Sequence, residues 1–238
     1  MLMTTTVKQR IQIDSEALAA QFEERGYALT STMLNEKECN ELIRLYDVAT
    51  TFRNRVVMER HNFGRGEYQY FADPIPEAVR QLRERLYAPL AELANRWTQR
   101  LRLNERYPGT LVEFLEFCRS RNQTLPTPLI LKYRKDDYNC LHQDLYGEVA
   151  FPLQAACVLS QHGLDYEGGE FLLTEQRPRM QTRGEAVTLE RGRFIIFPNR
   201  WRPVAGKRGD YRVNVRHGVS RLKSGKRYCL GIIFHNAK

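Results

Sequence analysis

The chain has 238 residues, 42% of them hydrophobic, and a formal net charge of +9. This length and composition allow a sizeable core in one domain with an appended helical region, and no apolar run reaches the ~18 residues of a membrane span. The five cysteines are scattered without a C-x-x-C pair, which argues against a disulfide framework or a zinc site and favours a reducing, cytoplasmic setting.

The first part of the chain is predicted to be largely helical. Residues 1–13 are polar and lack the apolar segment of a secretory signal. A helix is expected over residues 14–25, between an N-terminal cap and Gly26, followed by a short strand over 27–29. Residues 35–38 resemble a capping box, which opens a second helix with an apolar face at helical spacing.

Segment 53–71 alternates basic and aromatic residues, and two interpretations of it stay open. It could be a lid over a substrate, because bases stack on aromatic rings and phosphates pair with arginine. Arg65 and Tyr68 would then be substrate contacts. The alternative is a hairpin that packs on the rest of the fold.

A long helical pattern covers residues 76–101, where Pro89 should break or kink the helix near Ala88. Another short helix is expected around residues 111–118. We therefore predict that residues 1–126 form an N-terminal helical layer, which includes the candidate lid.

From residue 127 onward the pattern changes to short strands separated by glycine, proline and aspartate, which is typical of a barrel or jelly roll. We therefore expect an α+β fold that is mainly β, in which residues 127–238 form the β-domain. The candidate strands lie at 129–133, 141–145, 153–159, 170–173, 186–189, 193–197, 212–219 and 228–235.

The positive charge is concentrated in the last part of the chain. Residues 171–238 contain 16 Lys and Arg against four Asp and Glu, a balance of +12, whereas the first 170 residues carry −3. This asymmetry suggests an anionic partner, nucleic acid first and a protein second; a basic solvated surface without a partner is the alternative. In the polar segment 175–183, Arg177 and Arg179 could contact substrate, or they could lie in a solvated hairpin tip.

The pattern that carries chemistry is His142-x-Asp144. On a strand, side chains two positions apart point to the same face, so an imidazole and a carboxylate would meet at one point. They are two thirds of the 2-His-1-carboxylate triad that holds non-haem Fe(II) and leaves positions open for oxygen and a co-substrate. The third ligand must come from a distant strand, and His217, in the alternating stretch 213–219, is the remaining candidate. For His142 alone, an ordinary core or surface histidine is the alternative.

Arg227 follows His217 by ten residues, across a turn that is expected at 223–226. Such a turn would bring Arg227 into the same cavity, where a buried guanidinium could bind a ligand carboxylate through two hydrogen bonds. Leu131 and Tyr133, on an earlier strand, could line that cavity as well. Alternation along the last strand would turn four residues inward: Arg227, Cys229, Gly231 and Ile233.

Four features together resemble the iron(II)/2-oxoglutarate-dependent dioxygenases, in the order and spacing of their prolyl-hydroxylase-type branch: His142-x-Asp144, the turn at 168–170, His217 and Arg227. Three segments are more narrowly similar to a bacterial family described as oxygenases that demethylate damaged DNA: 139–148, 175–181 and 216–220.

The resemblance implies a double-stranded β-helix, the jelly-roll or cupin-like barrel, with N-terminal helices packed on its outside and a metal at one mouth. By residue match, Fe(II) would be held by His142, Asp144 and His217. Arg227 would hold the distal carboxylate of 2-oxoglutarate, and Tyr133 would be a second hydrogen-bond donor to it. The implied reaction uses O2, converts 2-oxoglutarate to succinate and CO2, and hydroxylates the substrate, with ascorbate as a candidate reductant.

Two enzyme hypotheses and one binding hypothesis follow. The first is a dioxygenase that removes an N-alkyl group from a nucleic acid by oxidation, as in the repair of alkylated DNA. The second is the same chemistry on a protein side chain, such as prolyl hydroxylation. The third is a catalytically silent barrel that binds nucleic acid. The chain retains the full set of residues expected for catalysis, which argues against this hypothesis: His142, Asp144, His217 and Arg227.

Overall fold

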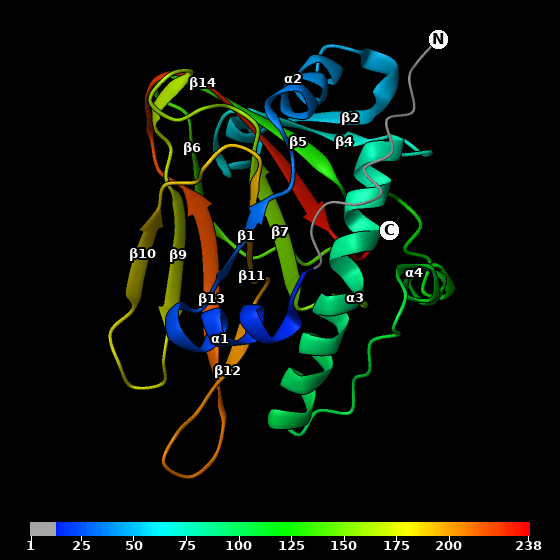
Figure 1. Ribbon diagram of the computed structural model, residues 1–238, viewed down its shortest axis with the longest axis vertical. Coiled ribbons are helices and arrows are strands. Elements are labelled where there is room, and N and C mark those ends of the chain that lie inside the picture. The colour runs from blue at the N-terminus through cyan, green and yellow to red at the C-terminus, as the bar shows by residue number, and fades with distance from the viewer. Residues whose placement is uncertain (1–12) are drawn as a thin grey trace.

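The computed structural model describes residues 13–238, which form two antiparallel β-sheets and four α-helices (Figure 1). Most of the segment considered for a secretory signal, residues 1–12, lies outside the described residues. None of the helices within residues 13–238 is long and apolar enough to cross a membrane. The helices are α1 (Ser15–Arg25), α2 (Glu36–Leu45), α3 (Glu77–Arg100) and α4 (Leu111–Ser120), with short 3-10 turns η1 (Ala49–Thr51) and η2 (Met58–His61).

The strands are arranged in a larger and a smaller sheet. In spatial order, the larger sheet contains β1 (Ala28–Thr32), β11 (Arg193–Pro198), β7 (Leu153–Val158), β14 (Leu222–Ile233), β5 (Leu129–Arg134), β4 (Glu67–Phe71) and β2 (Phe52–Val57), and β8 (Tyr166–Gly168) pairs with β14. The smaller sheet contains β10 (Arg183–Val187), β9 (Phe171–Gln176), β13 (Tyr211–Val219), β6 (Tyr138–His142) and β3 (Gly64–Arg65), and β12 (Trp201–Val204) pairs with β13.

The two sheets enclose one apolar cluster, and the helices form a second one with the outer face of the larger sheet (Figure 1). Leu173 of β9 and Cys229 of β14 belong to the cluster between the sheets. Leu230 and Ile232 of β14 are buried in the outer cluster together with Leu86 of α3. Each such buried side chain contributes about 1.5–3 kcal/mol. The predicted alternation along the last strand is therefore confirmed.

The ends of the first two helices follow the predicted caps. The Asp14 carboxylate accepts hydrogen bonds from the N–H groups of Glu16 and Ala17, and Gly26 ends α1 at a φ of 88°. The capping box at residues 35–38 is present at the start of α2.

Helix α3 continues through Pro89, so a break near Ala88 is wrong, whereas the alternative, a kink at this position, stays a prediction. Proline removes one backbone hydrogen bond from a helix. Side chains on both sides of it, including Leu86, Leu90 and Trp97, are buried in the outer apolar cluster. Packing of both halves against the sheet therefore outweighs the lost hydrogen bond.

Several predicted strand boundaries are wrong, among them 186–189, where β10 covers Arg183–Val187, and two of the differences affect the candidate site. Strand β6 ends at His142 instead of running over 141–145, so Asp144 lies in a loop. The expected turn at 223–226 lies inside β14, which pairs first with β8 and then with β5 and β7. Gly225, at a φ of 78°, supplies the irregular backbone where the strand changes partners. Strands β8 and β12 were not predicted, because three and four residues are too few to show alternation.

Segment 53–71 is a hairpin of the larger sheet, which favours the packed interpretation over a free lid. Strand β2 pairs with β4, and β4 pairs in turn with β5. Between them, β3 pairs with β6 of the smaller sheet, so the segment joins both sheets. The division of the chain at residue 126 stays a prediction, although β1, β2 and β4 precede it and share a sheet with later strands.

Glu175 of β9 and Arg202 of β12 form a buried ion pair, and each side chain is only 3% exposed. We predict that Arg202→Ala lowers the free energy of unfolding by about 3–5 kcal/mol, because the Glu175 carboxylate would stay buried without a partner. Urea denaturation measures this change. The matched variant Glu190→Ala breaks the more exposed pair with Arg193 and should cost less than about 1 kcal/mol. Equal losses in the two variants would contradict the prediction.

Candidate functional site

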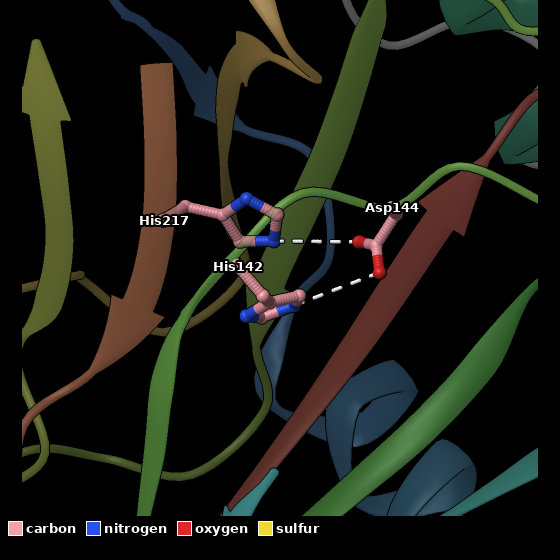
Figure 2. Close-up of side chains that lie close together, drawn as sticks. All are labelled: His142, Asp144 and His217. Atoms are coloured by element: carbon pink, nitrogen blue, oxygen red, sulfur yellow. Dashed lines mark ion pairs between the residues drawn. The ribbon is translucent and has the colours of Figure 1, made fainter. Parts of the chain in front are cut away.

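Two histidines and one aspartate meet at the inner face of the smaller sheet (Figure 2). His142 and His217 are directly opposite each other in the β6–β13 ladder, and their ring centroids are 4.2 Å apart. The Asp144 carboxylate approaches both rings, with Oδ1 3.6 Å from His142 Nε2 and Oδ2 3.4 Å from His217 Nε2. One ligand atom from each residue lies within 4.8 Å of the others, which is compact enough for all three to share one metal ion.

Asp144 is held by side chains, and the strand alternation expected for it is absent. The buried side chain of Asn199 accepts a hydrogen bond from the Asp144 N–H at 3.1 Å and donates one to the Asp144 carbonyl at 2.5 Å. The Gln154 side chain of β7 donates to the same side-chain oxygen, Asn199 Oδ1, at 2.7 Å and so fixes the orientation of the Asn199 amide group. The loop thus has a defined position without a β-ladder.

Two tyrosines support the carboxylate of Asp144 from the other side. The Tyr146 hydroxyl donates to Asp144 Oδ1 at 2.7 Å, and the Tyr70 hydroxyl of β4 donates to the Tyr146 oxygen at 3.1 Å. Sequence reasoning missed Asn199, Tyr146 and Tyr70. Only Tyr146 had a usable indication, its place two residues after Asp144. Tyr70 comes from strand β4 and Asn199 from the turn between β11 and β12, both far away in the sequence.

The protonation states of the three residues suit a divalent cation. His142 Nδ1 lies 2.8 Å from the Cys140 carbonyl, which can only accept, so Nδ1 carries the proton and Nε2 offers its lone pair. Burial, together with nearby His142, lowers the pKa of His217 and favours its neutral form. Burial opposes ionisation of Asp144, but the interactions of its carboxylate with His217, His142 and Tyr146 outweigh burial and hold the pKa of this carboxyl well below its usual range.

The three residues lie in a cavity of about 350 Å³ that also contains Arg227 and Tyr133. These two residues are directly opposite each other in the β14–β5 ladder, and both are almost fully buried. Two nitrogens of Arg227, Nε and Nη1, have no hydrogen-bond partner among the described residues. The Tyr133 hydroxyl has none either. Buried guanidinium nitrogens without hydrogen-bond partners are costly, so an anion that enters the cavity and accepts hydrogen bonds from Nε and Nη1 would relieve this cost.

The glycine pair at 168–169 makes room for the Arg227 side chain. A Cβ at Gly169 would lie 2.7 Å from Leu222 Cδ1 and 3.1 Å from Arg227 Cδ. Gly169 also has a φ of 65°, where a side chain is strained. Rings of Tyr133 and Tyr166 flank the guanidinium, with centroids 5.6 and 5.9 Å from its carbon.

The other residues that the sequence proposed as substrate contacts are placed differently. Tyr68 of β4 lines the cavity. Arg65 of β3 pairs with Glu59 at 3.0 Å and does not line it. Arg177 and Arg179 follow β9 in the connection to β10 and do not line it either. Their contact with substrate stays a prediction.

Three exposed apolar side chains line the same cavity, namely Phe63, Leu141 and Leu145, at 48%, 42% and 45% exposure. Large apolar groups at this exposure are costly in water and mark binding surfaces when they gather in one place. The entrance to the site is therefore apolar, while its interior holds the charged groups.

Comparison with known proteins identifies the family of the chain and its fold. The family described as "Oxygenase, catalysing oxidative methylation of damaged DNA" matches residues 66–237. Uncharacterized proteins from two strains of Mycobacterium tuberculosis are each 46% identical over 167 residues, which are 70% of this chain and 72% of theirs.

Two solved structures share the fold. A Pseudomonas putida prolyl-4-hydroxylase has a TM-score of 0.52 at 15% identity, over 94% of this chain and all of the other. An oxidoreductase of the 2OG-Fe(II) oxygenase family from Burkholderia pseudomallei has a TM-score of 0.55 at 14% identity, over 96% and 95%. With the antiparallel sheets, this likeness confirms the expected jelly-roll core.

The hydrogen bond from Tyr146 should matter for metal binding, because it leaves the second carboxylate oxygen of Asp144 free for the ion. We predict that Tyr146→Phe weakens the affinity for Mn(II) by about ten- to hundredfold, measured by calorimetry. Tyr87→Phe is the matched control, since its buried hydroxyl donates to the Pro108 carbonyl and touches no member of the triad. Equal Mn(II) affinity in Tyr146→Phe and the parent would refute this role.

Proposed function

Because the chain belongs to the family of oxygenases described as acting on damaged DNA, and is an oxidoreductase, we propose that it is an Fe(II)- and 2-oxoglutarate-dependent dioxygenase. One observation carries the proposal. The same cavity holds a compact His-Asp-His set and, between the sheets, a buried guanidinium with two nitrogens, Nε and Nη1, that have no hydrogen-bond partner among the described residues. The first suits a divalent metal, and the second suits the carboxylate of a small co-substrate.

In this proposal His142, Asp144 and His217 would hold Fe(II), and its remaining positions would stay open for the co-substrate and oxygen. When bound there, the iron lets O2 convert 2-oxoglutarate to succinate and CO2 while one oxygen atom enters the substrate. Asn199 and Tyr146 keep the Asp144 carboxylate in place before the metal arrives, so that little reorganisation is needed.

Arg227 and Tyr133 bind the distal carboxylate of 2-oxoglutarate and orient its other end toward the metal ligands. The guanidinium donates two hydrogen bonds in a fixed plane, and the Tyr133 hydroxyl adds a third. Apolar side chains around them, such as Phe171 and Leu131, keep water away from the reacting groups.

For the substrate, we favour an alkylated nucleic acid, which would lose its N-alkyl group as an aldehyde after hydroxylation of the attached carbon. The family description, the +12 balance of residues 171–238 and the apolar entrance support it. A base has to leave the duplex stack to reach a site between two sheets. Prolyl-type hydroxylation of a protein is the second candidate, which the ten-residue spacing from His217 to Arg227 favours.

We predict that the purified protein with Fe(II) and 2-oxoglutarate forms succinate slowly even without a substrate. His142→Ala and Asp144→Ala should abolish both Mn(II) binding and succinate formation, because two ligands cannot replace three. Calorimetry and succinate quantification measure these effects. A variant that binds Mn(II) as well as the parent would show that the ligands are chosen wrongly.

Arg227→Ala should weaken 2-oxoglutarate binding by about thirtyfold or more, while Mn(II) affinity is retained, because only the carboxylate anchor is lost. Lys226→Ala, an exposed neighbour on the same strand, is the matched control and should have no effect. If Arg227→Ala binds 2-oxoglutarate as tightly as the parent, the residue that binds the carboxylate would instead be Lys223, Lys226 or Arg221.

The nucleic-acid hypothesis predicts that affinity for single-stranded DNA falls steeply with salt, with a log–log slope of about −0.7 for each phosphate contacted. Methylated oligonucleotides should also stimulate succinate release and yield formaldehyde. Proline-containing peptides provide the comparison. If DNA does not bind at low salt while a peptide stimulates turnover, protein hydroxylation becomes the better assignment.

A further inference from the structure

A second cavity, of about 490 Å³, lies beside the catalytic one. Its walls come from the connection between α3 and α4, from α4 itself, from the loop after Asp144 and from the turn between β11 and β12. Leu145 lines both cavities, and Asn199, which holds Asp144, lines the second. The two cavities are therefore neighbours, separated by the loop that carries a metal ligand.

Three aromatic rings offer stacking surfaces in this second cavity, namely Tyr107, Phe117 and Trp201. Phe117 is 44% exposed, although it is a large apolar side chain on a helix. Trp201 is partly exposed, and the Arg212 guanidinium lies 5.1 Å from its ring centroid, which adds positive charge beside the indole. Such flat rings at a surface bind unstacked bases without sequence preference.

Two guanidinium groups in the lining have no partner. The exposed side chains of Arg106 and Arg200 make no hydrogen bond or ion pair with any of residues 13–238. The acidic residues of the lining are Glu105 and Glu148, and Glu148 already pairs with Arg121 at 3.2 Å. Two arginines without a partner thus face one glutamate without a partner, Glu105. This positive balance beside aromatic rings favours an anionic ligand with a flat ring.

We propose that the second cavity binds the nucleotide next to the target in single-stranded nucleic acid. Its base stacks against Trp201 or Phe117, and the phosphate that joins it to the target base pairs with Arg200 and Arg106. The chain of the nucleic acid passes over Leu145, whose side chain is shared by the two cavities. This inference rests on the proposed function and assigns the recognition of the flanking nucleotide to residues outside the catalytic cavity.

Intrinsic fluorescence provides a direct test, because the chain has two tryptophans and Trp97 is buried in the core. A short single-stranded oligothymidylate should quench the emission of Trp201 on binding, and Trp201→Phe should remove the quenching. Fluorescence anisotropy of the labelled oligonucleotide should show about tenfold weaker binding for the double variant Arg106→Ala/Arg200→Ala and a smaller salt slope. Lys37→Ala/Arg44→Ala, which removes two exposed charges from α2, is the charge-matched control and should bind like the parent.

Mn(II) and 2-oxoglutarate affinities, measured on the same samples, separate this inference from the proposed function. If both ligands bind and the oligonucleotide neither quenches Trp201 nor depends on Arg106 and Arg200, the flanking-nucleotide site is refuted while the dioxygenase assignment stands. If an acidic peptide quenches the Trp201 emission and DNA does not, the flanking-nucleotide site is likewise refuted. If Mn(II) and 2-oxoglutarate do not bind, the proposed function itself fails.

Discussion

The register between β6 and β13 places two imidazole rings side by side, and the rest of the site is built outward from that pair. Residues directly opposite each other in an antiparallel ladder point to the same face, so His142 and His217 share the interior. A slip of one residue would turn one ring outward. Gly218 allows close approach here, since a Cβ would lie 2.7 Å from the Asn139 carbonyl oxygen. The candidate metal site thus depends on backbone pairing before any side chain is considered.

The cavity has a negatively charged group at one place and a positively charged group at another, so the two ends of a bound ligand meet different surroundings. The carboxylate of Asp144 stands beside the histidines, while the guanidinium of Arg227 lies on a strand of the other sheet. A small dianion that binds with one end at Arg227 has its other end available for a cation held by the triad. Arg227 and the two histidines lie on strands, which keeps the separation of the two ends constant better than loops would. Asp144 lies in a loop, and its hydrogen bonds with Asn199 hold it beside the histidines.

Much of the candidate site could be predicted from the sequence. His217 lies in a strand with clear alternation, whereas the roles of Arg227 and Tyr133 followed from the resemblance to the dioxygenases, and the structure brings all three into one cavity with His142. Asn199 could not be predicted, because a polar residue in a turn has many possible partners and only tertiary contacts select one. Pro89 shows the same limit for the fold: local propensity predicts a break, and packing of both halves of α3 overrides it.

The hairpin of β2 and β4 has a consequence for any attempt to shorten the protein. Strand β4 covers one side of β5 and carries Tyr70, which supports Tyr146 beside Asp144. A truncated chain that starts at residue 127 would leave β5 as a bare edge, open to pairing with another molecule and hence to aggregation. The minimal catalytic unit should therefore begin upstream of β2, and the early segment is as much a part of the barrel as the strands that carry the ligands.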